Sequence, residues 1–410
     1  MARVPLPRQV CSLVRSKQLE SAFCFRKMKH VLRPHQILVA GLFVGLTGCS
    51  TGSRTGPGSG RPYSHSAPPP NPVPEAVERV PEGPRLAPPP VSVPEFARPH
   101  PNGYVETWIP LGRWSRENGY GPLRRISQGP EPAFALVTSN GIFSVQINSL
   151  VANWEGLELH LGFAPQLIDD QPFVHLLDLR KNLEPLIRSC APPAKTNGIV
   201  VIDPGHGGQN TGAASVADGV YEKEFTLDWA RRLEPLLANE GWQVFLTRTN
   251  DRDVPLADRV AFAEDHRADL FVSLHFNSSA PNQEQAGVET YCLTPAGMPS
   301  TLTRGYEDDC SLVFTNNAFD AQNLQYAICF QRALLPVIGN DRGVRHARFL
   351  GVLRGQNRPA VLIEGGYLSN PREAQRIADP AYRQKLAEAL AAGLSPETGN
   401  GRTKTVADER

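Results

Sequence analysis

Short apolar runs rich in β-branched residues alternate with segments of helical periodicity between residues 198 and 394, and this alternation constrains the fold more than any other feature. Residues 222–239 carry apolar side chains at helical spacing and are followed by Gly241, a common residue just beyond a helix end. The pattern predicts an α/β domain over 195–395, with a mixed, mostly parallel sheet and helices on both faces. Its buried strands are predicted at 199–202, 270–274 and 360–363.

Further elements complete this domain. Asn370 is followed by Pro371 and Glu373, which combine an N-cap, a proline at the first helical position and a glutamate at the third. Asp379 and Pro380 begin a final helix. Other strands are predicted at 242–246 and 288–293, and other helices around 256–263 and 324–335.

A small α+β domain is predicted over 102–190. Residues 134–138 and 142–147 flank Asn140-Gly141, which favours a type I′ hairpin turn. Apolar residues between 179 and 187 recur at helical spacing. The stretches 104–114 and 173–183 are similar to each other, and this part of the chain resembles the copper amine oxidase N-terminal module. The resemblance implies a wall-binding or positioning role.

The first hundred residues have the composition of a targeting segment followed by a linker. The apolar run 37–46 is shorter than the roughly 20 residues of a membrane-spanning helix, and basic residues precede it. Leu46 to Cys49 resembles the lipobox of bacterial lipoproteins, in which the cysteine is acylated. We therefore predict a signal segment over 1–48, with Met28 as the start of an ordinary signal peptide, and a lipid anchor at Cys49.

Proline crowds the stretch that follows, and this predicts a disordered linker over 49–101. The tail 396–410 is also predicted to be disordered. The net charge of +1 argues against a nucleic-acid partner, because nucleic-acid binders carry a basic field. The membrane, reached through Cys49, is the expected partner instead. In a two-membrane bacterium, Ser50 is similar to the residue of lipoproteins sent to the outer membrane, so the chain would face the periplasm.

Polar side chains follow three of the predicted strands. His206 comes after the first strand, His275 after the third and Glu364 after the late one, and Glu222 begins the first helix. Ligands bind at the carboxyl ends of strands in open α/β sheets. Position alone therefore nominates these four residues as one site.

The residue types suit a single task. Two imidazoles and one carboxylate match the ligand set of a catalytic zinc, which leaves its fourth position for water. A further carboxylate must move the proton, and Glu364 suits that role because Gly365 and Gly366 would let a substrate approach the backbone. Taken singly, each residue has an ordinary alternative. A histidine after a strand is commonly structural, and Glu222 fits a solvated helix start.

Four ordered segments raise the specificity of this interpretation: VVIDPGHGG, YEKEFTL, LFVSLHFN and AVLIEGGYLSN. Together they resemble the zinc-dependent N-acetylmuramoyl-L-alanine amidase type 3 family. The resemblance implies that His206, Glu222 and His275 bind Zn²⁺ and that Glu364 is the catalytic base. It also implies that the substrate is peptidoglycan, cut between N-acetylmuramic acid and L-alanine.

Supporting roles and alternatives stay open. Asp203 is predicted to orient a ligand histidine, and the other supporting candidates are Asn277, Arg342 and Arg345, the arginines as anchors for substrate carboxylates. A cysteine nucleophile is the weaker alternative, since Cys292 lies in a predicted strand. Two further alternative functions are an inactive wall-binding regulator and a zinc peptidase acting within the stem peptide. A protein activator is an expected partner.

Overall fold

The computed structural model describes residues 107–189, 197–303 and 308–395. The predicted signal segment 1–48 with Met28, the anchor residue Cys49, the linker 49–101 and the tail 396–410 lie outside the described residues. Within the described part, none of the helices combines the length and the apolar character needed to span a bilayer.

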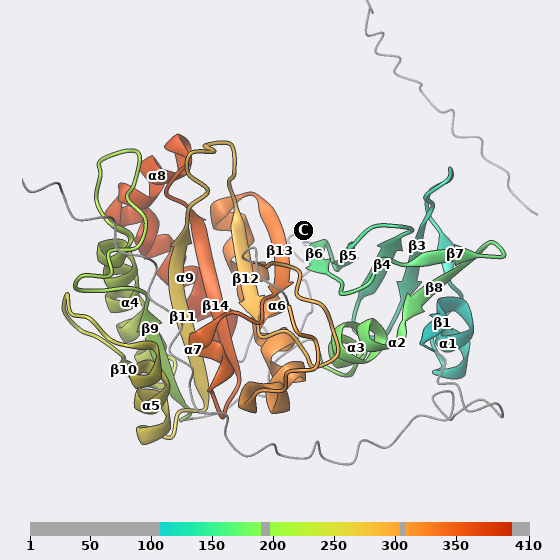
Figure 1. The fold of residues 1–410 in the computed structure, drawn as a ribbon, viewed down its shortest axis with the longest axis horizontal. Helices are drawn as coiled ribbons and strands as arrows, with labels where there is room; N and C mark the ends of the chain where they lie inside the picture. The colour runs from blue at the N-terminus through green and yellow to red at the C-terminus, as the bar shows by residue number, and fades with distance from the viewer. Residues whose placement is uncertain (1–106, 190–196, 304–307, 396–410) are drawn as a thin grey trace, which may run out of the picture. The chain divides into compact units, whose positions relative to one another are not determined.

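The predicted mixed sheet is confirmed (Figure 1). Its strands in the C-terminal part run in the order β10-β9-β11-β14-β12-β13. All neighbouring pairs in this run are parallel except β14 and β12, which are antiparallel. The strand bounds are β9 (Ile199–Pro204), β10 (Gln243–Leu246), β11 (Leu270–Asn277), β12 (Val288–Cys292), β13 (Asp341–His346) and β14 (Ala360–Tyr367).

Helices cover both faces of this sheet, as predicted (Figure 1). On one face lie α4 (Glu222–Asn239), α6 (Asp320–Ile338), α8 (Pro371–Ala378) and α9 (Pro380–Leu394). On the other lie α5 (Leu256–Asp265) and α7 (Gly351–Arg354). A short 3₁₀ helix, η3 (Thr315–Phe319), precedes α6. Alternate residues of each strand therefore face different cores: Val361 and Ile363 face the first set of helices, whereas Ala360 and Leu362 face the second.

The helix ends follow the predicted local signals. Gly241 adopts a φ of +89° just after α4, a conformation that glycine takes without a Cβ penalty. The side chain of Asn370 accepts hydrogen bonds from the amides of Arg372 and Glu373, and Asp379 caps α9 in the same way. Glu373 has a different role from a capping-box glutamate: it accepts hydrogen bonds from the amides of Tyr367 (2.7 Å) and Gly287 (2.9 Å).

The middle segment contains the strands and helices expected of a small α+β unit. Its strands are β1 (Trp108–Pro110), β2 (Arg124–Arg125), β3 (Ala133–Val137), β4 (Ile142–Gln146), β5 (Val151–Trp154), β6 (Leu157–His160), β7 (Gln166–Ile168) and β8 (Gln171–His175). Its helices are α1 (Leu111–Glu117) and a continuous run of α2 (Leu176–Asp178), η2 (Leu179–Leu183) and α3 (Glu184–Arg188). The similar stretches noted in the sequence are both a strand followed by a helix, and β1 and β8 pair antiparallel.

The predicted hairpin forms between β3 and β4, but the predicted type I′ turn is wrong. A type I′ turn needs positive φ at both central residues, and Asn140 keeps a negative φ. Its side chain instead donates a hydrogen bond to the carbonyl of Ile187, near the end of α3. This distant contact replaces the local turn geometry, and the loop closes through the Thr138 amide and the Gly141 carbonyl, 2.9 Å apart.

Strands β2 to β6 of the middle segment continue the C-terminal sheet, whereas β1, β8 and β7 form a separate three-stranded sheet. Leu159 of β6 pairs with Val344 of β13, which makes an 11-stranded sheet. The Nε2 of His160 lies 3.1 Å from the Arg342 carbonyl, and both segments contribute to one hydrophobic core. The domain boundary between 102–190 and 195–395 stays a prediction, whereas the contact shows that these parts pack directly.

Candidate metal and catalytic site

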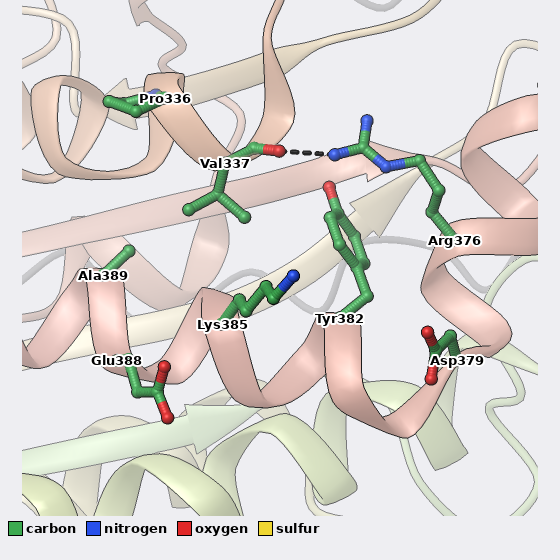
Figure 2. Close-up of a pocket in the computed structure, with 8 residues that line it drawn as sticks. All are labelled: Pro336, Val337, Arg376, Asp379, Tyr382, Lys385, Glu388 and Ala389. Carbon is green, nitrogen blue, oxygen red and sulfur yellow. Dashed lines mark hydrogen bonds between the residues drawn. The ribbon is translucent and has the colours of Figure 1, made fainter.

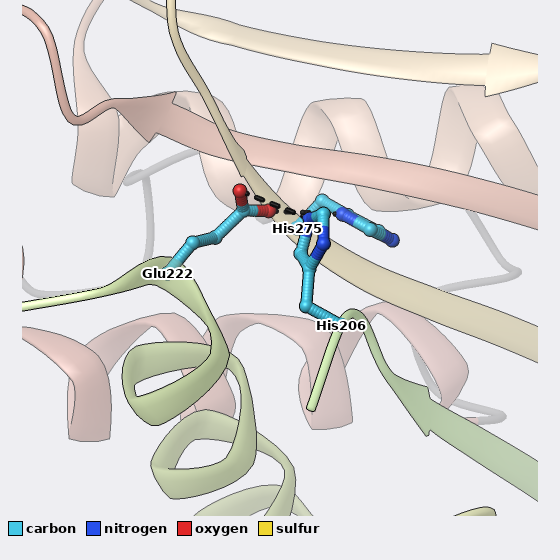
Figure 3. Close-up of side chains that lie close together, drawn as sticks. All are labelled: His206, Glu222 and His275. Atoms are coloured by element: carbon cyan, nitrogen blue, oxygen red, sulfur yellow. Dashed lines mark hydrogen bonds and ion pairs between the residues drawn. The ribbon is translucent and has the colours of Figure 1, made fainter. Parts of the chain in front are cut away.

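Three of the nominated side chains converge. His206 follows β9, Glu222 begins α4 and His275 lies near the end of β11, and Figure 3 shows the three side chains turned toward one another. The Nε2 of His206 lies 3.0 Å from Oε2 of Glu222, and the Nδ1 of His275 lies 2.9 Å from Oε1 of Glu222. One ligand atom from each residue can be chosen so that all three lie within 4.8 Å of one another.

This spacing fits a divalent cation. Ligand atoms at about 2.0–2.2 Å from a tetrahedral zinc lie about 3.3 Å apart. The separations of 3.0 Å and 2.9 Å between Glu222 and the two histidines are close to this value. Burial raises the pKa of Glu222, but its contacts with His206 and His275 outweigh burial and hold that pKa far below its usual range. Burial lowers the pKa of His206, yet the hydrogen bond and charge of Glu222 outweigh it, and the pKa is raised. The cluster thus holds a buried carboxylate that favours positive charge beside it.

Glycines leave the space that these side chains occupy. A Cβ at Gly205 would lie 2.2 Å from the ring of His275, and a Cβ at Gly212 would lie 2.6 Å from Oε2 of Glu222. His206 itself has a φ of +62°, which is strained for a residue with a side chain. The backbone is held on the C-terminal side of His206, where Gly207 and Asn210 exchange two hydrogen bonds, and Arg259 donates a hydrogen bond to the His206 carbonyl.

Asn210 orients His206, a role that sequence reasoning missed. Its Oδ1 lies 2.8 Å from Nδ1 of His206, so Nε2 is left to face Glu222. The loop is held from outside by two aspartates: Asp253 accepts hydrogen bonds from the amides of Gln209 and Asn210, and Asp251 accepts one from Gly208. The spacing of Asn210, four residues after His206 within one turn, is the signal that could have identified it.

Among the described residues, Asp203 forms no hydrogen bond with a histidine side chain, so its predicted role of orienting a ligand histidine stays a prediction that depends on an intermediate residue. Its carboxylate is buried and accepts hydrogen bonds from Arg259 (2.6 Å), Thr247 (2.5 Å) and Ser273 (2.8 Å). Arg259 also donates to the backbone carbonyl of His206 at 2.7 Å. Arg259 therefore links the carboxylate of Asp203 to the backbone of His206. The sequence feature that could have identified Arg259 is a charged residue at a position of α5 that faces the core.

We expect Asp203→Asn to lower the free energy of unfolding by about 3 kcal/mol at pH 7, because it leaves the buried charge of Arg259 without its partner. Burial raises the pKa of Asp203, but the charge of Arg259 and the hydrogen bonds from Thr247, Ser273 and Arg259 together outweigh burial, and the pKa is lowered. A lowered carboxyl pKa stabilises the fold above the unfolded value of about 3.9, and that stability is lost as the pH falls toward the folded value. Urea unfolding between pH 7 and pH 3.5 measures both effects.

The difference between wild type and Asp203→Asn should shrink on the acid side of pH 4. Glu117→Gln is the matched control, because it breaks an exposed Arg113–Glu117 pair and should change stability little. A difference that stays constant down to pH 3.5 would contradict the assigned charge pair.

Glu364 lies next to the cluster on the sheet. Parallel pairing sets Glu364 of β14 beside His275 of β11, and antiparallel pairing sets it beside Glu289 of β12. The glycines after it have another function than the predicted one. Gly365 is buried, and a Cβ there would lie 2.7 Å from the ring of Trp229, whereas Gly366 has a φ of +124°. They serve packing and backbone geometry.

The remaining predicted residues gather around Glu289, which sequence reasoning also missed. The Nδ2 of Asn277 lies 3.1 Å from its carboxylate, and the Nε atoms of Arg342 and Arg345 lie 2.5 Å and 3.6 Å away. Glu289 is only 2% exposed. A carboxylate inside an otherwise uncharged buried strand was the signal, because such a group needs partners. Cys292 is buried in the same strand, and burial raises the pKa of its thiol far above the usual range, which disfavours a nucleophile.

A hollow of about 590 Å³ lies away from these residues (Figure 2). It is formed by α6, α8 and α9, and its lining comprises Pro336, Val337, Arg376, Asp379, Tyr382, Lys385, Glu388 and Ala389. Arg376 donates hydrogen bonds to the carbonyls of Val337 and Ile338 at the end of α6 and stacks over Tyr382. None of the nominated site residues lines it, and its contacts stabilise a helix end.

The C-terminal part of the chain is similar to known proteins. Residues 200–396 match the family model described as N-acetylmuramoyl-L-alanine amidase. The amidase AmiA of Escherichia coli K12 is 32% identical over 228 residues, which cover 50% of this chain and 78% of that protein. The amidase CwlM of Bacillus licheniformis is 34% identical, over 48% of this chain and 67% of that protein.

Among solved structures, the catalytic domain of the amidase CwlV from Bacillus (Paenibacillus) polymyxa var. colistinus is 32% identical. The match covers 49% of this chain and 98% of that one, with a TM-score of 0.40. Two findings assign the family: the match to the family model, and the 32% identity to AmiA over 78% of that protein. The chain belongs to the N-acetylmuramoyl-L-alanine amidase family.

Proposed function

We propose that this chain hydrolyses the amide between N-acetylmuramic acid and the L-alanine of the peptidoglycan stem peptide, with zinc held by His206, Glu222 and His275. The observation that carries the proposal is the convergence of these three side chains, from three separate elements, in a chain of the amidase family. Two imidazoles and one carboxylate favour zinc over magnesium or calcium, which prefer oxygen ligands.

Zinc bound there would act as a Lewis acid and make water a nucleophile near neutral pH. The residues of the chain orient this chemistry. Glu222 holds His275 through one carboxylate oxygen and His206 through the other, and Asn210 keeps the ring of His206 turned. The amide of Phe276 also donates a hydrogen bond to Glu222, at 3.1 Å, which holds the carboxylate in its orientation.

Glu364 is proposed as the general base. It would take the proton of the attacking water and return it to the departing amine of L-alanine. Its pairing beside His275 supports this role, because facing residues of adjacent strands lie about 5 Å apart and point to the same side. Glu364 is not one of the three clustered ligand residues, so the proposal gives it a role other than metal binding.

Mass spectrometry of digested peptidoglycan tests the function directly. The full chain, loaded with zinc, should release free stem peptides that begin with L-alanine and leave intact sugar chains. Shortened stem peptides still attached to the sugar would instead identify a zinc peptidase. Absence of any product from zinc-loaded protein would favour the inactive regulator.

We also propose that Cys49 carries the lipid anchor and that the protein faces the periplasm, where peptidoglycan is reached through the proline-rich linker. The apolar run before Cys49 and the lipobox-like sequence support this. Cys49→Ser should move the protein from the membrane fraction to the soluble fraction, measured by fractionation and by the mass of the N-terminal peptide. An unchanged membrane fraction would refute the anchor. A protein activator is a further proposed partner.

A further inference from the structure

The buried carboxylate of Glu289 is the centre of a polar cluster that the proposed mechanism leaves unused. It accepts hydrogen bonds from the hydroxyls of Tyr291 (2.6 Å) and Tyr367 (3.0 Å), from Asn277 (3.1 Å) and from Arg342 (2.5 Å). Burial raises its pKa, but the contacts with Tyr291 and the arginines outweigh burial, and the pKa is lowered. Glu289 is therefore a fixed, charged anchor inside the protein.

This cluster shares a sheet face with the metal-ligand residues. The strand register sets His275 beside Glu364 and Glu364 beside Glu289, so the three form a row across β11, β14 and β12. Arg345 of β13 pairs with Tyr291, which faces the same side as Glu289. Its neighbour Val344 points to the opposite core. The row therefore continues from the metal-ligand residues to Arg345.

The two arginines differ in what their donors do. Arg342 donates from Nε to Glu289 and from Nη1 to Gln285 at 2.6 Å, and its guanidinium stacks 5.1 Å above the ring of Tyr367. Arg345 donates only from Nε, to the Arg342 carbonyl at 3.0 Å. Its nearest approach to Glu289 is 3.6 Å, also at Nε. Within the described residues, neither Nη group of Arg345 forms a hydrogen bond, and its side chain is 17% exposed.

We propose that Arg345 binds a carboxylate of the stem peptide, at a subsite built on Glu289 and Arg342. The proposal rests on the amidase function proposed above. A guanidinium with both Nη groups available can hold a carboxylate through two parallel hydrogen bonds. Glu289 and Arg342 act as positioning residues, because Glu289 holds Arg342 and the carbonyl of Arg342 holds Nε of Arg345.

The distance along the sheet selects which part of the substrate this is. Two strand spacings, about 10 Å, separate His275 from Glu289. The side chain of Arg345, although it starts from β13, lies at this distance too, because its Nε is 3.6 Å from the Glu289 carboxylate. An extended peptide advances about 3.3–3.6 Å per residue. The carboxylate bound by Arg345 therefore belongs to the second or third residue after the scissile amide. The recognised substrate would be a stem peptide with a free carboxylate there, and amidation of that group would weaken it.

Matched substrates and variants of the full chain test this subsite. We would compare muramoyl tripeptides with free carboxylates, with an amide at the second residue, and with an amide at the third. For wild type, one of the two amidations should lower kcat/KM by about 10–100-fold, the loss expected for a charge-assisted pair. Arg345→Gln should lower kcat/KM of the free form by the same factor and leave that of the sensitive amidated form unchanged.

Binding gives a readout that does not need turnover. Isothermal titration of the free stem tripeptide should show about 10–100-fold weaker binding to Arg345→Gln than to wild type, with partial recovery in Arg345→Lys, which keeps the charge but not the planar fork. Arg372→Gln, at an exposed arginine of α8, is the control and should bind as wild type does. Zinc content and circular dichroism should match in all variants.

The outcomes separate the two proposals. If wild type releases no stem peptide from any substrate, the amidase function fails, while the titration still tests Arg345. If wild type is active but Arg345→Gln loses the same factor on every substrate, amidated ones included, the subsite is overturned. Equal tripeptide affinity in wild type and Arg345→Gln would overturn it as well.

Discussion

Glu364→Gln is expected to lower turnover of muramoyl peptides by about 1,000-fold, within the range that general acid–base catalysis contributes. Glutamine keeps the size of the side chain but cannot accept the proton of the attacking water. The zinc content should stay at the wild-type level, because the ligand atoms come from His206, Glu222 and His275. Initial rates and metal analysis on the same preparation measure both quantities.

Glu224→Gln is the matched control for this prediction. Glu224 is exposed and lies only two residues from Glu222, so the same chemical change near the site should leave turnover almost unchanged. Near-normal activity of Glu364→Gln would show that another group moves the proton. A joint loss of zinc and activity would instead place Glu364 among the ligands.

His206→Ala should weaken zinc binding by more than 100-fold and reduce turnover to background. Removal of an outer hydrogen-bonding partner typically costs about 10–100-fold in metal affinity, and loss of a ligand atom should cost more. The structure supplies a graded comparison, because Asn210 contacts His206 at 2.8 Å without belonging to the ligand cluster. Asn210→Ala should therefore weaken zinc binding by only about 10–100-fold. Chelator competition measures the affinities, and circular dichroism checks the fold.

His266→Ala serves as the control histidine, since His266 lies on α5's end and contacts the Phe262 carbonyl rather than the site. It should bind zinc as wild type does. Wild-type zinc affinity in His206→Ala would remove that residue from the ligand set. Equal losses in His206→Ala and Asn210→Ala would indicate that the loop is disturbed as a whole.

The elements of the C-terminal part follow from local signals. The helix from Glu222 to Asn239 has the bounds expected from its periodicity and from Gly241, and Asn370 and Asp379 cap their helices as expected. These features depend on residues close together in the chain, so hydrogen bonding and backbone geometry within one turn decide them. The turn at Asn140 is the exception, because a contact with Ile187 outweighs the local preference.

The convergence of the site also follows from the sequence, since parallel strands bring their carboxyl ends to one edge. The hydrogen-bond partners of the nominated residues, however, do not follow from the sequence. Asp203 was expected to orient a ligand histidine, and the structure pairs it with Arg259. Arg342 was expected to hold a substrate carboxylate, and the structure pairs it with Glu289. Each of these pairs joins residues more than 50 positions apart, and both depend on strand order and register.

The sequence by itself determined the α/β class, the helix ends and the ligand types, because periodicity, capping and side-chain chemistry are local properties. The tertiary structure alone decided the pairing of β6 with β13, the buried network of Asp203 and Arg259, and the row from His275 to Arg345. Those features arise where strands distant in sequence become neighbours. The free energy of burying a charged group then selects its partner from the residues that the register brings within reach.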